Sequence, residues 1–464
     1  MAATASPAPA PAPSPSPSHR RSLRKRRTII VTAAATAAGI GAGILVLNAN
    51  AASTTATVDL YHQTLAAKDG WASSGTGTTG GAKADAAHTF TVSTRAQLVK
   101  ALGSTSDTTP RIVKIKGPID ANTDDSGEKV SCAEYSSGTG YSLAAYLKAF
   151  APSAYGTSKL PSGTQEKARA AAQAKQGKNI IFRVPANTTV VGVPGTKAGI
   201  TGGMLQIQSV DNVIVRNLTF AATQDCFPQW DPTDGDSGNW NSQYDAVTLR
   251  GATHVWADHN TFTDAPGLDT SDPAYYGRQY QIHDGDLDIT KGSDLVTVER
   301  NQFTNHDKTM LIGSSDTDSV GKLRVSIHHN VWKGIVQRAP LARIGQIHIY
   351  NNFYDTTNLN GYVLQYSVNS RAKAQVVAED NYWKIPASQK VGKLFSGDGT
   401  GSIAGGGNLV NGTATDLVAA YNAANSKKLK TTVNWTPTLK AGLETSAKNL
   451  PTELATTTGA GVLS

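Results

Sequence analysis

The chain has 464 residues, of which 39% are hydrophobic and only 17% charged, and this composition excludes an intrinsically disordered polyelectrolyte. The formal net charge of +8 is misleading, because six of the basic residues lie between residues 20 and 27 and the first 52 residues contain no acid. The remainder is close to neutral, so bulk charge does not support a nucleic-acid partner.

Residues 1–52 have the composition of a targeting segment. The basic cluster precedes an apolar run over residues 29–47, and Ala49-Asn50-Ala51 then gives the small-x-small pattern of a signal-peptidase site. The alternative is an uncleaved N-terminal anchor, because the run is nearly long enough to span a bilayer. We expect an exported chain, with a flexible lead over residues 53–85 and a single domain over residues 86–464.

The first part of this domain contains both cysteines and two helical stretches. In an exported chain two cysteines pair more often than they stay free, which predicts a disulfide between Cys132 and Cys226; the alternative is two buried thiols. The sequence also predicts helices over residues 141–150 and 165–176, which we expect to flank the N-terminal end of the domain.

An internal repeat dominates the middle of the chain. Each copy has small apolar residues at its first and third positions, Asn at its sixth and an aromatic residue at its eighth. The repeat Asn residues lie 41, 29, 22 and 29 positions apart, and a looser copy precedes them at residues 214–220. The copies span residues 255–262, 296–303, 325–332, 347–354 and 376–383.

This repeat predicts an all-β fold, a single-stranded parallel β-helix with short flanking helices and long loops. The alternating apolar residues indicate a half-buried strand, and we expect the Asn to adopt the left-handed backbone of the following turn. Stacked coils would let the Asn side chains form a ladder. After Leu409 the repeat is lost, and we expect the chain to pack back along the solenoid.

The register of the repeat brings acidic residues together. When Asn260 is superimposed on Asn301, Asp245 falls on Asp286, and an extended segment points Asp284, Asp286 and Asp288 to one face. Carboxylates this close repel one another unless a cation neutralises them, and Ca²⁺ suits such an oxygen site. The alternative is a solvated acidic strip, and the role of Asp286 stays open.

Two basic residues, Lys308 and Arg338, fall on the same strip, and Arg343 follows them in the sequence. Lys308 lies seven residues after Asn301, Arg338 lies eight after Asn330, and Arg343 follows five further on. These cations either form salt bridges with the acids or, together with a metal ion, bind a polyanion in a groove.

Histidines could suggest a zinc site instead. Most of them sit at the turn positions of the repeat, so packing and turn bonding is the favoured explanation for this set: His259, His283, His306, His328 and His329. The motifs of other hydrolytic and phosphate-binding enzymes are absent from the sequence: Gly-x-Ser-x-Gly, the phosphate loop and His-Glu-x-x-His.

Over residues 212–383 the chain resembles the extracellular pectate lyases of the right-handed parallel β-helix family. The resemblance rests on motifs in the order of that family: the segment 225–235 (DCFPQWDPTDG), Trp256 to Asn260, His283-Asp284-Gly285, Asn305 to Lys308, Leu311 to Gly313, and Gln337 to Pro340.

The resemblance implies an activity and a set of roles. Asp245, Asp284 and Asp288 would bind calcium, Lys308 and Arg343 would hold substrate carboxylates, and Arg338 would be the catalytic base. The implied reaction is β-elimination of α-1,4-polygalacturonate, the pectate of plant cell walls, to a 4,5-unsaturated oligomer.

Other activities stay open on the sequence alone. A pectin lyase acting on methylated substrate would not need the acidic trio, and a hydrolase would use carboxylates as acid and base. A non-catalytic polysaccharide-binding β-helix is the remaining alternative. We expect a secreted monomer that binds neither nucleic acid nor, once mature, a membrane.

Overall fold

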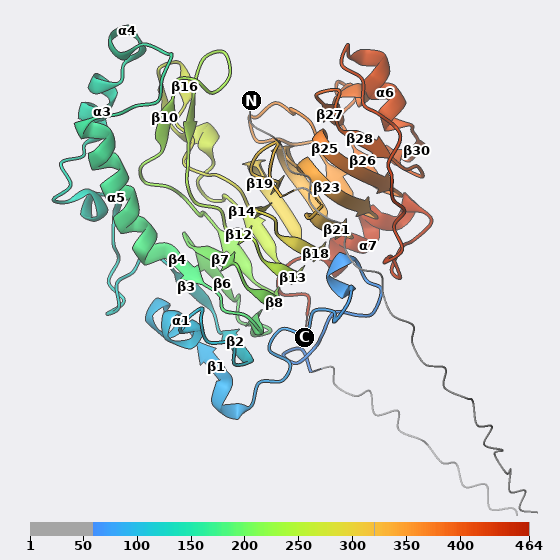
Figure 1. The fold of residues 1–464 in the computed structure, drawn as a ribbon, viewed down its shortest axis with the longest axis horizontal. Helices are drawn as coiled ribbons and strands as arrows, with labels where there is room; N and C mark the ends of the chain where they lie inside the picture. The colour runs from blue at the N-terminus through green and yellow to red at the C-terminus, as the bar shows by residue number, and fades with distance from the viewer. Residues whose placement is uncertain (1–58, 320, 464) are drawn as a thin grey trace, which may run out of the picture. The chain divides into compact units, whose positions relative to one another are not determined.

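The protein is a right-handed parallel β-helix in a computed structural model that describes residues 59–319 and 321–463. The predicted targeting segment, residues 1–52, lies outside the described residues. From β4 to β29 each coil contributes one strand to each of three parallel sheets, here named A, B and C in the order given below, and β30 adds an antiparallel strand to sheet C. Figure 1 shows the coils stacked side by side, from the green strands near α5 to the orange strands near α6.

Sheets A and B form one continuous network because two long strands run through both. Sheet A contains β1 (Thr89–Val92), β2 (Arg111–Ile115), β5 (Thr188–Gly192), β8 (Asp211–Arg216), β13 (Thr253–Asp258), β18 (Asp294–Glu299), β21 (Arg324–His328) and β28 (Ser402–Ala404). Sheet B contains β4 (Ile181–Arg183), β7 (Met204–Gln208), β12 (Val247–Arg250), β17 (Leu287–Thr290), β20 (Leu311–Ile312) and β27 (Phe395–Gly397). The shared strands are β23 (Leu341–Tyr350) and β25 (Val368–Glu379).

Sheet C closes each coil. It contains β3 (Pro118–Asp120), β6 (Gly199–Thr201), β9 (Thr219–Ala221), β14 (Thr261–Thr263), β19 (Gln302–Lys308), β22 (Val331–Gln337), β24 (Phe353–Asp355), β26 (Tyr382–Lys384), β29 (Leu409–Val410) and β30 (Thr413–Ala414). A typical coil runs from β12 through β13 to β14, and the next from β17 through β18 to β19.

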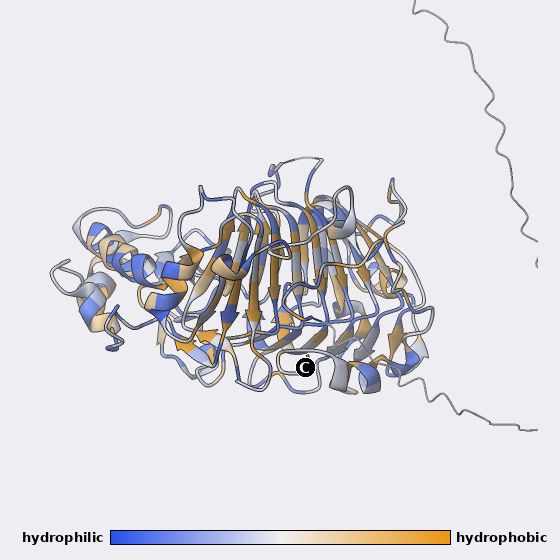
Figure 2. Cartoon of the chain, turned by 90° about the horizontal axis from the view of Figure 1, so that it is seen from below, coloured by the Kyte–Doolittle hydropathy of each residue, from blue (hydrophilic) through white to orange (hydrophobic). Residues whose placement is uncertain are grey.

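The apolar alternation of the repeat forms the core between the sheets. Val255 and Ala257 of β13 point inward and pair in register with Val296 and Val298 of β18. The aromatic residue of each repeat also turns inward, so aromatic rings stack from coil to coil: Phe220, Phe262, Phe303, Trp332, Tyr354 and Trp383. Figure 2 shows the resulting orange apolar positions along the stacked strands.

The repeat Asn residues form the predicted ladder, but they are not the residues with left-handed backbone. The amide oxygen of Asn301 accepts from the backbone N–H of Asn260 at 2.9 Å, and Asn330 accepts likewise from Asn301. The ladder continues through Asn352, Asn381 and Asn408. The positive φ falls on the preceding residue, for example 52° at His259, because the ladder Asn must keep its amide pointed inward.

The ladder predicts a large stability effect at Asn330. Its buried side chain accepts from two nitrogens of Asn301 and donates to the backbone carbonyls of Val298 and His328. Asn330→Ala leaves these groups without partners, so we expect the free energy of unfolding to fall by about 3 kcal/mol. Thermal or urea unfolding measures the loss, and the exposed Asn358→Ala is the control. Equal stability of the two variants would contradict this role of the ladder.

Helices and hairpins flank the coils, most of them near the N-terminal end. Cys132 of α2 is joined to Cys226 by a disulfide. The predicted helical stretches form α3 and α5 (Figure 1). The helices are α1 (Arg95–Leu102), α2 (Cys132–Ser136), α3 (Leu143–Ala149), α4 (Pro152–Tyr155), α5 (Thr164–Ile180), α6 (Leu417–Ala424) and α7 (Leu450–Thr457), and the hairpins are β10 (Gln229–Asp231) with β11 (Asn239–Asn241) and β15 (Ala274–Tyr275) with β16 (Arg278–Gln279).

Short 3₁₀ helices complete the described elements: η1 (Trp71–Ser73), η2 (Ala86–His88), η3 (Asp269–Ser271), η4 (Val391–Lys393) and η5 (Ala447–Asn449). Within the described ranges, no helix combines the length and the apolar composition that a membrane span requires.

The described part of the expected flexible lead, residues 59–85, packs on sheet A instead. The backbone N–H of Ala72 donates to Thr297 Oγ1 at 3.0 Å, and that of Trp71 donates to Ser326 Oγ at 3.0 Å. Ala72 is buried with Trp256 in one apolar cluster. The Gly- and Ser-rich composition predicts a loose segment, but here it lets the backbone approach sheet A closely. A Cβ on Gly70 would collide with Thr297.

The segment after Leu409 packs back along the solenoid. Leu450 and Leu454 of α7 are buried against Val331 of sheet C. Further on, the backbone N–H of Ala460 donates to Thr261 Oγ1 at 3.0 Å.

Candidate functional site

The acidic residues meet on sheet B, in a register that differs by one residue from the predicted one. On sheet A the shift between coils is 41 residues, with Val255 opposite Val296, whereas on sheet B Val247 lies opposite Leu287, a shift of 40. The turn from β17 to β18 contains one residue more than the turn from β12 to β13, which explains the difference. Extrapolating this register along the chain places Asp245 opposite Gly285, not opposite Asp286.

Three of the four predicted carboxylates converge around Gly285. Its backbone N–H donates to Asp245 Oδ1 at 3.0 Å, and a Cβ at this position would lie 2.6 Å from Asp288 Oδ1 and 2.9 Å from Asp245 Oδ1. Only glycine therefore lets the two carboxylates approach each other here. Asp284 acts on both of them electrostatically, so Asp245, Asp284 and Asp288 form one acidic cluster.

The electrostatics of this cluster favour a bound cation. Burial, followed by the negative charge of Asp284, raises the pKa of Asp288 to about 7, and burial with the charges of Asp288 and Asp284 raises that of Asp245 well above its usual range. A divalent cation with oxygen preference would relieve this repulsion, and three carboxylates are a donor set that suits calcium. The residues present therefore fit the predicted ion.

Asp286, which the sequence left open, faces away from this cluster. Its Oδ1 lies 3.9 Å from His306 Nδ1, which is hydrogen-bonded to Asp264 at 2.7 Å. His306 Nε2 lies 2.7 Å from the backbone oxygen of Asp284. His306 thus supports the loop that presents Asp284, and Asp286 lies beside His306, an arrangement that the sequence pattern did not reveal.

Lys308 and Arg338 lie on adjacent coils, and Arg338 acts electrostatically on Asp284 and Asp288. Lys308 ends β19 opposite Gln337 of β22, so Arg338 is the next residue along. Burial lowers the pKa of Arg338, but the carboxylates of Asp284 and Asp288 outweigh it and leave the pKa above its ordinary value. The acidic cluster therefore favours the charged form of Arg338.

Neither cation is neutralised by a direct ion pair. Lys308 is only 5% exposed, and Arg338 Nε is buried without a hydrogen-bond partner. Across residues 59–319 and 321–463, no carboxylate lies within 4.0 Å of either side chain's nitrogens. Two cations without direct counter-ions beside an acidic cluster indicate a site for an anionic ligand.

Arg343 lies further along the same sheet, at the bulge between Ala342 and Ile344. Its Nη1 donates to the backbone oxygen of Gly313 at 3.1 Å, and its Nε lies 3.4 Å from Asp316. Burial, then the charges of Arg371 and Arg338, lower the pKa of Arg343. Arg343 is therefore held close to Arg338, although it already has a carboxylate partner.

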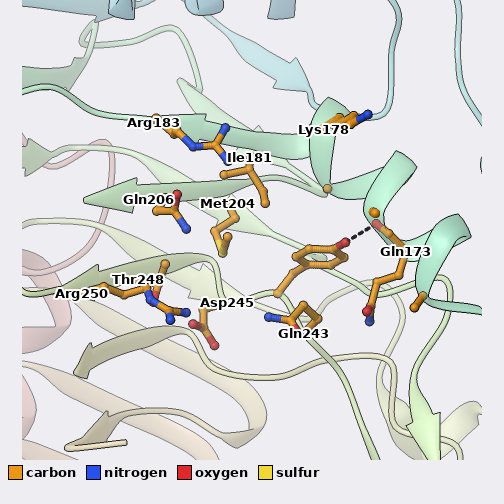
Figure 3. A pocket seen from close by; sticks show the side chains of 14 residues that line it. Gln173, Lys178, Ile181, Arg183, Met204, Gln206, Gln243, Asp245, Thr248 and Arg250 are labelled. Atoms are coloured by element: carbon orange, nitrogen blue, oxygen red, sulfur yellow. Dashed lines mark hydrogen bonds between the residues drawn. The ribbon is translucent and has the colours of Figure 1, made fainter. Parts of the chain in front are cut away.

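A cavity of about 290 Å³ adjoins the acidic cluster on the side of α5. Arg183, Gln206 and Thr248 occupy one row across β4, β7 and β12, in register with Asp288 of β17. Figure 3 shows Asp245 beside Arg250 and Thr248 in this cavity. The row of polar side chains on sheet B thus extends beyond the carboxylates. Its first residues, Arg183 and Gln206, lie outside the sequence repeat, so the repeat did not predict them.

Comparison with known proteins gives the family. A family model described as pectate lyase matches residues 154–459. The chain belongs to the pectate lyase family. It is 46% identical over 410 residues to a pectate lyase of Bacillus subtilis, covering 87% of this chain and 94% of that protein. Pectate lyase E of Dickeya chrysanthemi is 33% identical over 383 residues, covering 79% of this chain and 81% of its own length.

Solved structures agree with this assignment. A pectate lyase bound to a hexasaccharide has a TM-score of 0.82 at 43% identity, covering 88% of this chain and 100% of that chain. A thermostable pectate lyase has a TM-score of 0.84 at 40% identity, with the same coverage. The chain is a polysaccharide lyase with the predicted right-handed parallel β-helix fold.

Proposed function

We propose that the enzyme cleaves polygalacturonate by calcium-dependent β-elimination, with Asp245, Asp284 and Asp288 as the calcium ligands and Arg338 as the base. The observation that carries this proposal is the placement of Arg338, which has no direct counter-ion in the described chain, within the field of the acidic cluster. A pectin lyase on methylated substrate would need no such cluster, and a hydrolase would leave Lys308 and Arg338 without a role.

The calcium ligands and Arg338 have separate roles in the proposed reaction. Asp245, Asp284 and Asp288 would hold the calcium ion, whose positive charge would withdraw electrons from the uronate carboxylate and acidify the C5 hydrogen. Arg338 in its neutral form accepts the C5 proton. The electron pair of the C5–H bond becomes the C4–C5 double bond, the C4–O bond breaks, and the leaving oxygen takes a proton from solvent.

The other cations orient the polymer. The ammonium of Lys308 and the guanidinium of Arg343 would bind uronate carboxylates on either side of the base. The guanidinium suits this role because it can bind two carboxylate oxygens at once. Their charge also stabilises the negative charge that develops on the carboxylate as the proton leaves.

The enzyme is expected to act outside the cell, as a secreted monomer on the pectin of plant cell walls. The Cys132–Cys226 disulfide supports this proposal, because disulfides persist in oxidising compartments.

Metal removal tests the proposed function. With polygalacturonate and added calcium, we expect growth of the ultraviolet absorbance of the unsaturated product, and with excess chelator we expect that growth to stop and to return when calcium is restored. Growth only on methylated pectin would identify a pectin lyase. Reducing ends without absorbance would identify a hydrolase, and the absence of both products would leave a binding protein.

A further inference from the structure

A second group of polar residues lies on sheet A, where one row of outward side chains crosses six coils. Strand register alone aligns them, and five of the six can carry a charge. The row consists of Arg216, Asp258, Glu299, His328, Tyr350 and Glu379.

The ends of this row form direct ion pairs that involve lysine or arginine, whereas within the described chain its centre has none, and among these cations only the more distant charge of Arg300 acts on it. Arg216 pairs with Asp258 at 2.6 Å, and Glu379 pairs with Lys440 at 2.8 Å. Glu299 in the middle is 7% exposed, and within the described chain no lysine or arginine nitrogen lies within 4.0 Å of its carboxylate. The carboxylate of Asp69 lies beside that of Glu299 and also has no lysine or arginine nitrogen within 4.0 Å in the described chain. The centre of the row therefore holds two acids.

Asp69 reaches the row from the segment 59–85 that packs on sheet A. Its backbone is fixed there, because Thr297 Oγ1 donates to its carbonyl oxygen at 3.4 Å and the next residue, Gly70, donates to Leu439 at 3.0 Å. Three stretches of chain therefore meet at Asp69: the N-terminal segment, sheet A and the C-terminal tail.

The two carboxylates converge on one imidazole nitrogen. His328 Nε2 lies 3.5 Å from Asp69 Oδ1 and 3.6 Å from Glu299 Oε2. His328 is 1% exposed, its Nε2 has no hydrogen-bond partner, and its Nδ1 is occupied by His329 at 2.9 Å. Asp69 Oδ1 and the hydroxyl of Tyr350 are also buried without partners. Buried polar atoms are nearly always bonded, so these atoms could share one bound partner.

The spacing of these atoms is that of ligands around a metal ion. It is too long for hydrogen bonds, whereas ligand atoms about 2.1 Å from a tetrahedral ion lie about 3.4 Å apart. We propose that Asp69, Glu299 and His328 bind one divalent cation of the zinc class, which fastens the N-terminal segment to sheet A. The imidazole favours zinc-class ions over calcium, whose ligands are oxygens. This site is structural, and it lies on a different sheet from the acidic cluster of the lyase reaction.

The other buried His-carboxylate group does not qualify. In the group of Asp264, Asp286 and His306, both ring nitrogens of His306 are already within 2.7 Å of a hydrogen-bonding oxygen. His306 therefore has no free lone pair for an ion, and this group supports Asp284 instead.

Metal analysis tests the proposal independently of lyase activity. The purified enzyme is saturated with calcium, incubated with Zn²⁺ alone as the probe, passed through a desalting column and analysed for bound zinc. We expect one zinc per chain, and at least about 10-fold weaker zinc binding in Asp69→Asn. Zinc should raise the melting temperature of the wild type but not of Asp69→Asn. The matched control is Asp59→Asn, since Asp59 is an exposed acid of the same segment that bonds His62.

Two further measurements keep the proposal open to refutation. Asp288→Asn should retain the zinc, because its carboxylate belongs to the calcium cluster; loss of zinc there would assign the ion to that cluster and overturn the proposal. Co²⁺ bound to the wild type should give the visible absorption of a nitrogen-coordinated ion, which needs no variant to fold. Absence of stoichiometric zinc in the wild type, or equal zinc binding by Asp69→Asn and Asp59→Asn, would also overturn it.

Discussion

Arg338→Ala is expected to lower kcat on polygalacturonate by between about 100-fold and 10,000-fold while polymer binding is largely kept. The reason is that Arg338 is the proposed base and has no direct ion pair in the described chain, whereas Arg343 already contacts Asp316 and Gly313. Initial rates from product absorbance, together with polymer binding measured by calorimetry, separate the two effects.

The matched variant in the same groove is Arg343→Ala. Because Arg343 is proposed to hold a substrate carboxylate, its loss should raise KM more than it lowers kcat. A kcat of Arg338→Ala within threefold of the wild type would remove Arg338 from the role of base.

The pH profile provides a second readout for Arg338. The base must lose its proton to act, and the charges of Asp284 and Asp288 outweigh burial and raise the pKa of Arg338. The active fraction therefore grows as pH rises, so we expect an alkaline optimum. A rate that stays flat between neutral and strongly alkaline pH would count against Arg338 as the base.

Gly285→Ala is expected to raise the calcium concentration for half-maximal activity by about 10-fold to 100-fold. The added Cβ would lie 2.6 Å from Asp288 Oδ1 and 2.9 Å from Asp245 Oδ1, so the two carboxylates must move apart. The φ angle of Gly285 is not in the left-handed region, so the effect comes from space and not from backbone strain. Calcium titrations of activity measure it.

Gly267→Ala is the control, because a Cβ there meets nothing within 4 Å and its backbone is also unstrained. Asp284→Asn should shift the calcium requirement in the same direction as Gly285→Ala, since it removes one carboxylate. An unchanged calcium requirement in Gly285→Ala would show that the ion does not bind between Asp245 and Asp288.

The coil architecture could be predicted from sequence because it is periodic. Each repeat places its inward residues at fixed distances from the ladder Asn, so strands and stacking aromatic rings follow from spacing alone. The prediction placed the left-handed backbone on the repeat Asn, whereas it falls on the residue before it. Asn tolerates this backbone, and the sequence pattern could not show that the Asn amide is already hydrogen-bonded in the ladder.

The site was less predictable because it sits where the period breaks. Asp245 and Asp284 belong to the ends of long loops that enter sheet B, and an extra turn residue after β17 moves the register there by one. The sequence could not show that Asp286 lies beside His306 while Asp284 and Asp288 act on each other in the acidic cluster. Nor could it show that residues 59–85 have a surface to pack on, since the partners Thr297 and Ser326 lie more than 200 residues away.

The three corners of each coil differ in how much their lengths vary, which has a consequence for how this enzyme could diversify. From β8 to β26, two residues separate each sheet A strand from the following sheet C strand, and the second of them is the ladder position. The connections from sheet C to sheet B instead range from the two residues after β19 to the long excursions after β9 and β14. The corner from sheet A to sheet C thus keeps its length over these coils, whereas the other two corners vary, as residues 313–323 between β20 and β21 also show. New specificities can therefore evolve in the loops of the variable corners while the fixed corner keeps the coils in register.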